Sequence, residues 1–331
     1  MKRNRSKILL LLAAGLVGLV AAVACLSFSA NGLKVAHSHT KEASPEPTLG
    51  VLIALPPESL DTPGIARMNL LCQQGLSGAG DLDINRALNL VDQMAARVRS
   101  ETKRHLYRFE RNPGEFENSK GFFRMVMMGV VLTEDFGIHY NPQRGIAPGE
   151  TRPDDGFFAD PRMVFLSGLL EPGREGTCTS LPVLYVAVGR QLGYPLKLVA
   201  TKGHLFVRWE GGGERFNIEA TGRGVNRFED NYYRHWPFEI NAAEEAAEGY
   251  LKSLSPTEEL AVFLSIRGMC LRESGQLAQA AESFAAASRL SPGTRSYQQM
   301  ADSLGLKAGT GNRSGGDKSA LIQRDGSHSK L

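Results

Sequence analysis

Apolar residues recur at helical intervals in the first half of the chain, and the pattern predicts several helices. Over residues 82–109, and again over 119–132, the apolar positions lie three and four residues apart, as in an amphipathic helix. Asp160 followed by Pro161 predicts an N-cap and first helical position, opening another helix that continues to Leu170.

Short runs rich in β-branched and aromatic residues follow and predict strands. Residues 196–201 form one such run, and residues 204–210 and 214–219 form two more, separated by three glycines. Two runs joined by a glycine turn are typical of a β-hairpin. We therefore expect residues 204–219 to fold back on themselves.

The register of this hairpin decides which side chains meet. A turn centred on Gly211-Gly212 leaves one face wholly apolar and sets His204 directly opposite Glu219, with Cβ atoms roughly 4.5–5.5 Å apart. A slip of one residue would turn Glu219 to the other face. The same register opposes Arg208 and Arg215, which counts against it.

A cysteine lies just before the next predicted helix. Residues 181–192 are apolar nearly all round, as expected of a buried helix, and Pro182 suits its first turn. Cys178 therefore lies at or just before a helix N-terminus, where the positive end of the dipole favours a thiolate. It is a candidate nucleophile, although a packed small side chain or half of a disulfide is the plainer alternative.

The hairpin supplies two candidate partners for this thiol. His204 is a candidate general base, and Glu219 a candidate carboxylate to orient the imidazole ring. Asn217, two residues away on the same face, is the rival for the orienting role, because an amide also fixes an imidazole tautomer. Each residue also has a purely structural interpretation, as a core histidine or a solvated strand-end carboxylate.

Four short motifs together resemble a known family. They are Gly-x-Cys-x-Ser-Leu-Pro at 176–182, Gly-His-Leu-Phe-Val-Arg-Trp at 203–209, Asn-Ile-Glu-Ala-Thr at 217–221 and the Tyr-Tyr pair at 232–233. The sequence resembles the bacterial branch of the transglutaminase-like superfamily over roughly residues 60–300. In that branch the core is in some members followed by tetratricopeptide repeats.

The resemblance implies a fold and a set of site residues. The implied fold class is α+β, a papain-like core with the cysteine on a central helix and the other two residues on an antiparallel sheet. Cys178 matches the nucleophile, His204 the base and Glu219 the third member of the triad. Asparagine or aspartate is commoner at the third position in the superfamily, so Glu219 departs from the usual pattern.

The last third of the chain matches one tetratricopeptide-type repeat. Small and aromatic residues fall at the spacing of that repeat at Gly268, Gly275, Ala280, Phe284, Ala287 and Pro292. A single repeat cannot bury its own core. We therefore expect these helices to dock on the preceding domain, the alternative being a peptide-binding groove for a protein partner.

The pattern at the amino terminus predicts that the chain associates with a membrane. Basic residues among the first seven precede an uncharged stretch over 8–33, long enough to cross a bilayer, which needs about 17–25 residues. We expect a single uncleaved anchor in the cell membrane with the domain outside the cytoplasm. Cleavage after residues 22–24, giving a secreted or periplasmic protein, and lipidation of Cys25 are the alternatives.

Charge and cysteine usage exclude other classes of function. The formal net charge of +3 comes from the basic amino terminus, and no later stretch forms a basic stripe, so we predict no nucleic-acid partner. Four cysteines are too few for a disulfide scaffold, although Cys72 and Cys270 remain a candidate pair. No Cys-x-x-Cys or His-x-x-x-His spacing is present, so we predict no metal and no cofactor.

These observations together predict an exported or membrane-anchored transglutaminase-like cysteine enzyme that acts on amide or acyl bonds of a peptide or protein. The alternatives are a non-catalytic peptide-binding or scaffold module at the cell envelope, and a structural envelope protein with an inert Cys178. Tyr232, Tyr233 and Trp236 either line a substrate groove or pack in the core. The predicted division is an anchor or signal peptide (1–33), a linker (34–60), a helical part (61–150), the catalytic core (151–250), tetratricopeptide-type helices (256–305) and a disordered tail (306–331).

Overall fold

A computed structural model describes residues 48–62, 64–80, 82–144, 156–170, 173–222 and 224–313. The predicted anchor, most of the linker and residues 314–331 lie outside the described residues. Within the described ranges, no helix is long and apolar enough to cross a membrane. All described residues belong to one unit that begins at Pro47.

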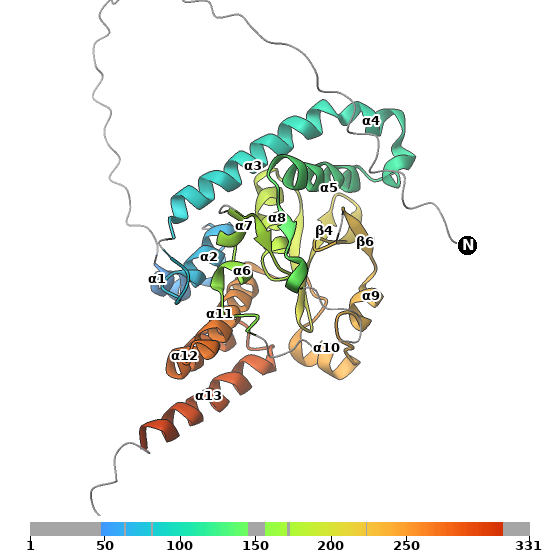
Figure 1. The fold of residues 1–331 in the computed structure, drawn as a ribbon. Helices are drawn as coiled ribbons and strands as arrows, with labels where there is room; N and C mark the ends of the chain where they lie inside the picture. The colour runs from blue at the N-terminus through green and yellow to red at the C-terminus, as the bar shows by residue number, and fades with distance from the viewer. Residues whose placement is uncertain are drawn as a thin grey trace, which may run out of the picture. The chain divides into compact units, whose positions relative to one another are not determined.

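Along the described chain, helices precede and follow a block of four consecutive strands, and two short strands lie among the earlier helices (Figure 1). The helices are α1 (Leu49–Ala54), α2 (Gly64–Gln73), α3 (Ile84–Arg104), α4 (Leu106–Arg111), α5 (Lys120–Val130), α6 (Pro161–Val164), α7 (Ser167–Leu170), α8 (Leu181–Gln191), α9 (Asp230–His235), α10 (Ala242–Glu248), α11 (Pro256–Glu273), α12 (Leu277–Leu290) and α13 (Arg295–Arg313). The strands are β1 (His139–Tyr140), β2 (Glu175–Gly176), β3 (Leu196–Thr201), β4 (His204–Gly211), β5 (Glu214–Glu219) and β6 (Asn226–Phe228).

Helix α8 is the centre of the fold. Every residue from Leu181 to Gly189 is buried, which confirms the prediction of a helix enclosed on all sides. On one side α8 contacts α2 and α3, and on the other it contacts strands β3 and β4 (Figure 1). A helix with no polar stripe is stable in this position because no face of it meets water.

The helix predicted over 82–109 is two helices. Asp83 caps α3 by accepting the backbone N–H of Arg86 at 2.9 Å, and the buried positions of α3 repeat along one face. The chain turns at His105, where the backbone leaves helical geometry, and α4 follows. The end of α3 carries Lys103 and Arg104, which complement the negative end of its dipole.

The four-stranded antiparallel sheet has the order β3-β4-β5-β6. Thr201 pairs with His204 at the tight turn between β3 and β4. The parallel pair β1-β2 is separate and brings Tyr140 beside Gly176, close to the start of the α8 segment. The fold therefore combines helices with an antiparallel sheet, as the α+β prediction requires.

The predicted register of the β4-β5 hairpin is wrong by two residues. Gly211 pairs with Glu214, so the two-residue turn is Gly212-Gly213 and not Gly211-Gly212. Both turn glycines have positive φ, 64° and 80°, as a type I′ turn requires. Val207 consequently faces Ile218 instead of Phe216.

Side-chain pairing explains why the sheet adopts this register. Arg215 lies opposite Glu210, not opposite Arg208 as predicted, so the like charges are separated. The rings of Trp209 and Phe216, now opposite one another, stack with centroids 5.8 Å apart. A shift of two residues preserves the face of every side chain, so His204 and Glu219 still share one side of the sheet.

The carboxyl-terminal helices pack against the rest of the unit. Helix α11 contacts α2, and the Arg267 guanidinium donates to the carbonyl oxygens of Cys72 and Gln74 at 2.8 and 2.9 Å. Within the pair α11-α12, Gly268 allows close approach, because a Cβ there would lie 2.7 Å from the Phe284 ring. The assignment of this pair to the tetratricopeptide family stays a prediction.

Candidate active site

The segment that carries Cys178 is held in place by hydroxyl groups. The Thr177 hydroxyl donates to the carbonyl oxygen of Met163 at 2.9 Å, and the Thr179 hydroxyl donates to that of Val164 at 3.0 Å. Both carbonyl groups belong to the last turn of α6, where carbonyl oxygens have no partner within the helix. They accept hydrogen bonds from the segment that precedes α8 instead. Cys178, between the two threonines, is buried with 3% of its surface exposed.

The same contacts explain why the helix predicted from Asp160 to Leu170 is broken. Asp160 caps α6 as predicted, accepting the N–H of Arg162 at 3.0 Å. Phe165 then takes an extended conformation, and the N–H of Leu166 bonds to the buried Asn69 side chain at 2.9 Å instead of continuing the helix. Tertiary hydrogen bonds thus override the local helical pattern.

Cys178 lies three residues before the first residue of α8. Ser180 is the N-cap residue, and Pro182 lies in the first turn as predicted. The sulfur is 3.9 Å from the carbonyl oxygen of Gly203, the residue before His204. The positive end of the α8 dipole and the start of strand β4 therefore both face the thiol.

His204 and Glu219 form a buried pair. The His204 Nε2 atom lies 2.8 Å from Glu219 Oε2, and the two side chains are only 2% and 5% exposed. Continued beyond its last pair, Val207 with Ile218, the observed register sets Glu219 opposite Phe206, so His204, two residues before Phe206, is a diagonal neighbour of Glu219. A diagonal pair is farther apart at the backbone than an opposed pair, but a glutamate side chain is long enough to close the gap.

The other oxygen of Glu219 is also satisfied. Glu219 Oε1 accepts the backbone N–H of Thr221 at 3.0 Å and the Thr221 hydroxyl. Burial by itself raises the pKa of Glu219, but the His204 charge and the hydrogen bonds from His204 and Thr221 outweigh it and lower that pKa. Glu219 is therefore an ionised carboxylate fixed at both oxygens.

The electrostatics of His204 follow from its two neighbours. Burial lowers the pKa of His204, but the charge of Glu219, together with hydrogen bonding and charge interaction with Cys178, raises it to about 9. Because Nε2 is engaged by Glu219, Nδ1 is the ring nitrogen available to Cys178. The imidazole thus interacts with both a carboxylate and a thiol.

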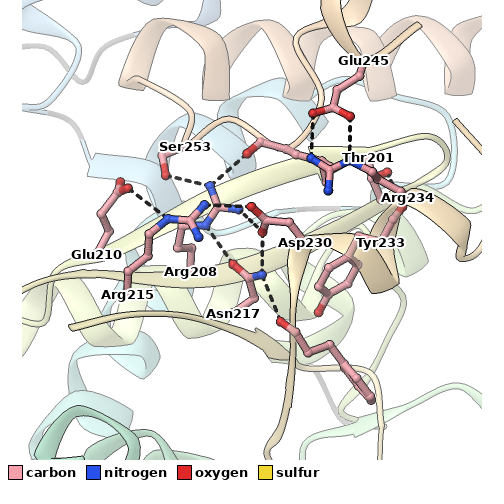
Figure 2. Close-up of polar contacts among 12 residues, drawn as sticks. Thr201, Arg208, Glu210, Arg215, Asn217, Asp230, Tyr233, Arg234, Glu245 and Ser253 are labelled. Carbon is pink, nitrogen blue, oxygen red and sulfur yellow. Dashed lines mark hydrogen bonds and ion pairs between the residues drawn. The ribbon is translucent and has the colours of Figure 1, made fainter. Parts of the chain in front are cut away.

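Asn217 lies in a different network. Its side-chain oxygen accepts Arg208 Nε at 2.8 Å, and its nitrogen donates to Asp230 and to the carbonyl oxygen of Phe228 at 2.8 and 3.0 Å (Figure 2). All its hydrogen-bonding groups are used there. The structure therefore places Glu219, and not its rival Asn217, against His204.

Sequence reasoning missed the buried arginine at the centre of this network. Arg208 is 2% exposed and donates to Asp230 at 2.7 Å, to Asn217, and to the carbonyl oxygen of Leu251 at 2.9 Å (Figure 2). Asp230 opens α9, so the network ties that helix to the central strand. An arginine inside an otherwise apolar strand run was the signal available in the sequence.

Helix α9 and Trp236, the residue that follows it, supply aromatic rings beside the imidazole. Trp236 meets the His204 ring edge-to-face at 4.6 Å, and Tyr233, fully buried, stacks on Phe206 at 3.7 Å. Tyr232 stacks on Phe228 at 4.0 Å. Tyr233 is therefore a core residue, whereas Tyr232 and Trp236 are half-buried beside the site.

The other described cysteines differ from Cys178. Cys72 and Cys270 are buried free thiols, so the candidate disulfide between them is not formed. Burial raises the pKa of each to about 12. Within the described ranges, no group of three or more His, Cys, Asp and Glu side chains is arranged to hold a metal ion.

Removing the Glu219 charge should lower the pKa of His204. In Glu219→Gln we expect the pKa to fall from about 9 toward its ordinary value of 6.5, because burial remains while the carboxylate charge is gone. NMR titration of the His204 ring measures this. Glu210→Gln, an exposed change on the same strand as His204, is the control and should leave the titration of His204 unchanged. Equal His204 titrations in Glu219→Gln and wild type would contradict the expectation.

The same pair makes stability depend on pH. The pKa of His204 is higher in the folded chain than its ordinary 6.5, so its protonation stabilises the fold fully below pH 6.5. That contribution is lost as the pH rises through about 9. Urea unfolding of wild type and Glu219→Gln should therefore differ most at neutral and mildly acidic pH, and the difference should shrink above pH 9.

Comparisons with known proteins identify a family for this chain. The family model described as "Transglutaminase-like superfamily" matches residues 85–261, more than half of the chain and a range that contains Cys178, His204 and Glu219. No curated protein matches the chain. A solved structure, "Crystal structure of menin reveals the binding site for Mixed Lineage Leukemia (MLL) protein", is similar with 14% identity and a TM-score of 0.26.

That similarity covers 57% of this chain and 52% of the menin chain, so the chain spans about half the length of that structure. At this TM-score the likeness carries no argument about fold or function. The family match is different in kind, because it extends over α3 to the start of α11 and includes the sheet and the cysteine segment. The chain belongs to the transglutaminase-like superfamily.

Proposed function

We propose that this protein is a cysteine acyl-transfer enzyme that acts on an amide of a peptide or protein, with Cys178 as nucleophile, His204 as acid and base, and Glu219 as the orienting carboxylate. The observation that carries the proposal is the buried His204, which is bonded to Glu219 through Nε2 at 2.8 Å and also interacts with Cys178. The transglutaminase-like domain supports cysteine-based acyl transfer as the reaction class.

The raised pKa of His204 defines the starting state. With a pKa of about 9, the imidazole is protonated at neutral pH, and a cation beside Cys178 stabilises the thiolate. The α8 dipole acts in the same direction. The nucleophile is then formed before substrate binds.

In the first step the Cys178 sulfur attacks the amide carbonyl carbon and forms a C–S bond. The C–N bond breaks, and His204 gives its proton to the departing amine. In the second step His204 takes a proton from the incoming water or amine, whose oxygen or nitrogen bonds to the acyl carbon as the C–S bond breaks. The products are an acid or a new amide, and the thiolate and imidazolium are restored.

Two further groups assist this chemistry. The backbone N–H of Cys178 is the proposed oxyanion donor, a contribution of about 2.7–4 kcal/mol for one donor at the right geometry. Trp236 shields the His204 ring from water on one side, which strengthens the interaction between His204 and Glu219. Glu219 holds the ring in the tautomer that leaves Nδ1 toward Cys178.

We also propose where the protein is located in the cell and to which branch of the superfamily it belongs. The basic amino terminus and the uncharged stretch over 8–33 support a membrane anchor with the domain outside the cytoplasm. The spacing of small residues from Gly268 to Pro292 supports a tetratricopeptide-type segment, and with it the bacterial branch of the superfamily. Protease protection of membrane fractions tests the topology.

The pH dependence of thiol labelling tests the catalytic proposal. Chloroacetamide should label Cys178 of the full-length chain well below pH 8, and mass spectrometry of the digest identifies the labelled peptide. Cys72 and Cys270, buried and with pKa values raised to about 12, are internal controls that should stay unlabelled. A Cys178 that labels no faster than these two would support the structural alternative and end the proposal.

A further inference from the structure

A cavity of about 370 Å³ opens beside the candidate active site. Its lining includes Thr179, the residue after Cys178, together with Gly203 and His204, so it adjoins residues that surround the thiol. Its volume is within the range of about 300–1,000 Å³ usual for small-ligand sites. A substrate held against His204 would therefore have room for one of its side chains here.

The carboxyl-terminal helices supply another part of the lining of this cavity. Val262, Ile266 and Met269 of α11 line it, as does Tyr297 of α13. These four residues follow residue 261, where the family match ends. The cavity is thus closed by a segment that the superfamily core does not supply.

The cavity wall combines apolar surface with negative charge. Phe158, Phe238 and Leu254 add to the apolar residues of α11, and the acidic residues Glu248 and Glu258 also belong to the lining. Among the described residues that line it there is no lysine or arginine. A ligand that fits this wall has an apolar stem and a positive end.

The two carboxylates are fixed but not neutralised. Glu248 Oε2 accepts the N–H and hydroxyl of Ser296 at 3.3 and 2.6 Å, and Glu258 Oε2 accepts the N–H and hydroxyl of Ser255 at 2.8 and 2.7 Å. Neither forms an ion pair with a described residue. Burial, together with the charges of Glu248 and Glu244, raises the pKa of Tyr250, another residue of the lining, to about 12.

We propose that this cavity is a specificity subsite for a basic substrate residue, a lysine- or arginine-type side chain next to the amide that Cys178 attacks. The apolar wall covers the methylene stem, and Glu248 and Glu258 receive the cationic end. The carboxyl-terminal helices thereby select the substrate. The inference rests on the proposed function, since it places the basic residue beside the reacting amide.

Binding to the full-length Cys178→Ala chain tests the subsite without turnover. The probes are three capped tripeptides, acetyl-Ala-X-Ala-methylamide, in which X is lysine, norleucine or glutamate. Norleucine keeps the apolar stem and lacks the charge. Ligand-observed NMR titration should give a dissociation constant for the lysine peptide about tenfold below that of the norleucine peptide, with the glutamate peptide weakest.

Variants of the cavity wall identify the source of this preference. In Glu248→Gln/Glu258→Gln, which keeps acceptor oxygens for Ser296 and Ser255, the lysine preference should fall below about threefold. Met269→Trp, which fills the cavity, should weaken both the lysine and the norleucine peptide. Glu282→Gln, an exposed change on α12 outside the cavity, is the matched control and should keep the full preference.

Equal binding of the three peptides, or a lysine preference that survives in Glu248→Gln/Glu258→Gln, would overturn the subsite. Unchanged binding of the lysine peptide to Met269→Trp would also overturn it. These outcomes are separate from the fate of the proposed function, because peptide binding needs no thiol. If Cys178 is labelled but the lysine peptide is not preferred, only the subsite is overturned. If the lysine peptide is preferred but Cys178 is unreactive, only the enzymatic function is overturned.

Discussion

Replacing Cys178 with alanine should abolish acyl-enzyme formation, and replacing His204 with alanine should slow it at least about a thousandfold. The two losses should not add, because the thiolate and the imidazolium act as one unit. Without His204 the thiolate loses its cation and the leaving amine loses its proton donor. The measurement is mass spectrometry of the intact chain after exposure to an activated acyl ester, with the rate followed in time.

Cys270→Ala is the matched control for the loss of a thiol. Cys270 is buried with a pKa raised to about 12 by burial, so it is not a thiolate at neutral pH and its removal should leave acylation unchanged. Glu219→Gln should be milder than His204→Ala, because the amide keeps the shape of the side chain while the charge is lost. Equal acylation of wild type and Cys178→Ala would rule out Cys178 as the nucleophile.

The candidate site was predictable where local chemistry decides it. An apolar helix preceded by a cysteine and carrying Pro182 in its first turn needs only the rules for helix starts. The sharing of one sheet face by His204 and Glu219 follows from strand periodicity and survives an error of two residues in register. The local sequence pattern was therefore enough to predict that Cys178, His204 and Glu219 lie near one another.

What the sequence did not predict depends on contacts between distant segments. The turn lies at Gly212-Gly213 because Glu210 then pairs with Arg215 and Trp209 with Phe216, a choice made by several pairs together. The break after α6 depends on Asn69, nearly a hundred residues away in sequence. Such contacts have no signature within a window of ten or twenty residues.

The burial of Arg208 is the clearest example. Its strand position looks like an ordinary outward-facing site, yet the side chain is enclosed by α9 and by the segment at Leu251–Ser253. Only the folded chain shows that Asp230 and Asn217 satisfy it. A buried charge tolerated in this way makes the network sensitive to the loss of a single partner.

Removal of Asp230 should therefore destabilise the fold strongly. In Asp230→Ala the Arg208 guanidinium, 2% exposed, loses its carboxylate, and Asn217 and Arg215 lose the same partner. Leaving one member of a buried pair uncompensated typically costs about 3–5 kcal/mol, and we expect about 3 because Asp230 itself is 24% exposed. Urea unfolding measures the change in the free energy of unfolding.

The surface pair Arg234–Glu245 is the matched control. Its side chains are 38% and 27% exposed, so Glu245→Ala should cost less than about 1 kcal/mol. A double-mutant cycle isolates the buried charge: in an Arg208→Met background, Asp230→Ala should cost much less than in wild type. If Asp230→Ala costs no more than Glu245→Ala, or costs the same in both backgrounds, then the Arg208 charge is not what Asp230 stabilises. The position of α9 then depends on the aromatic contacts of Tyr233 with Phe206 and of Trp236 with His204.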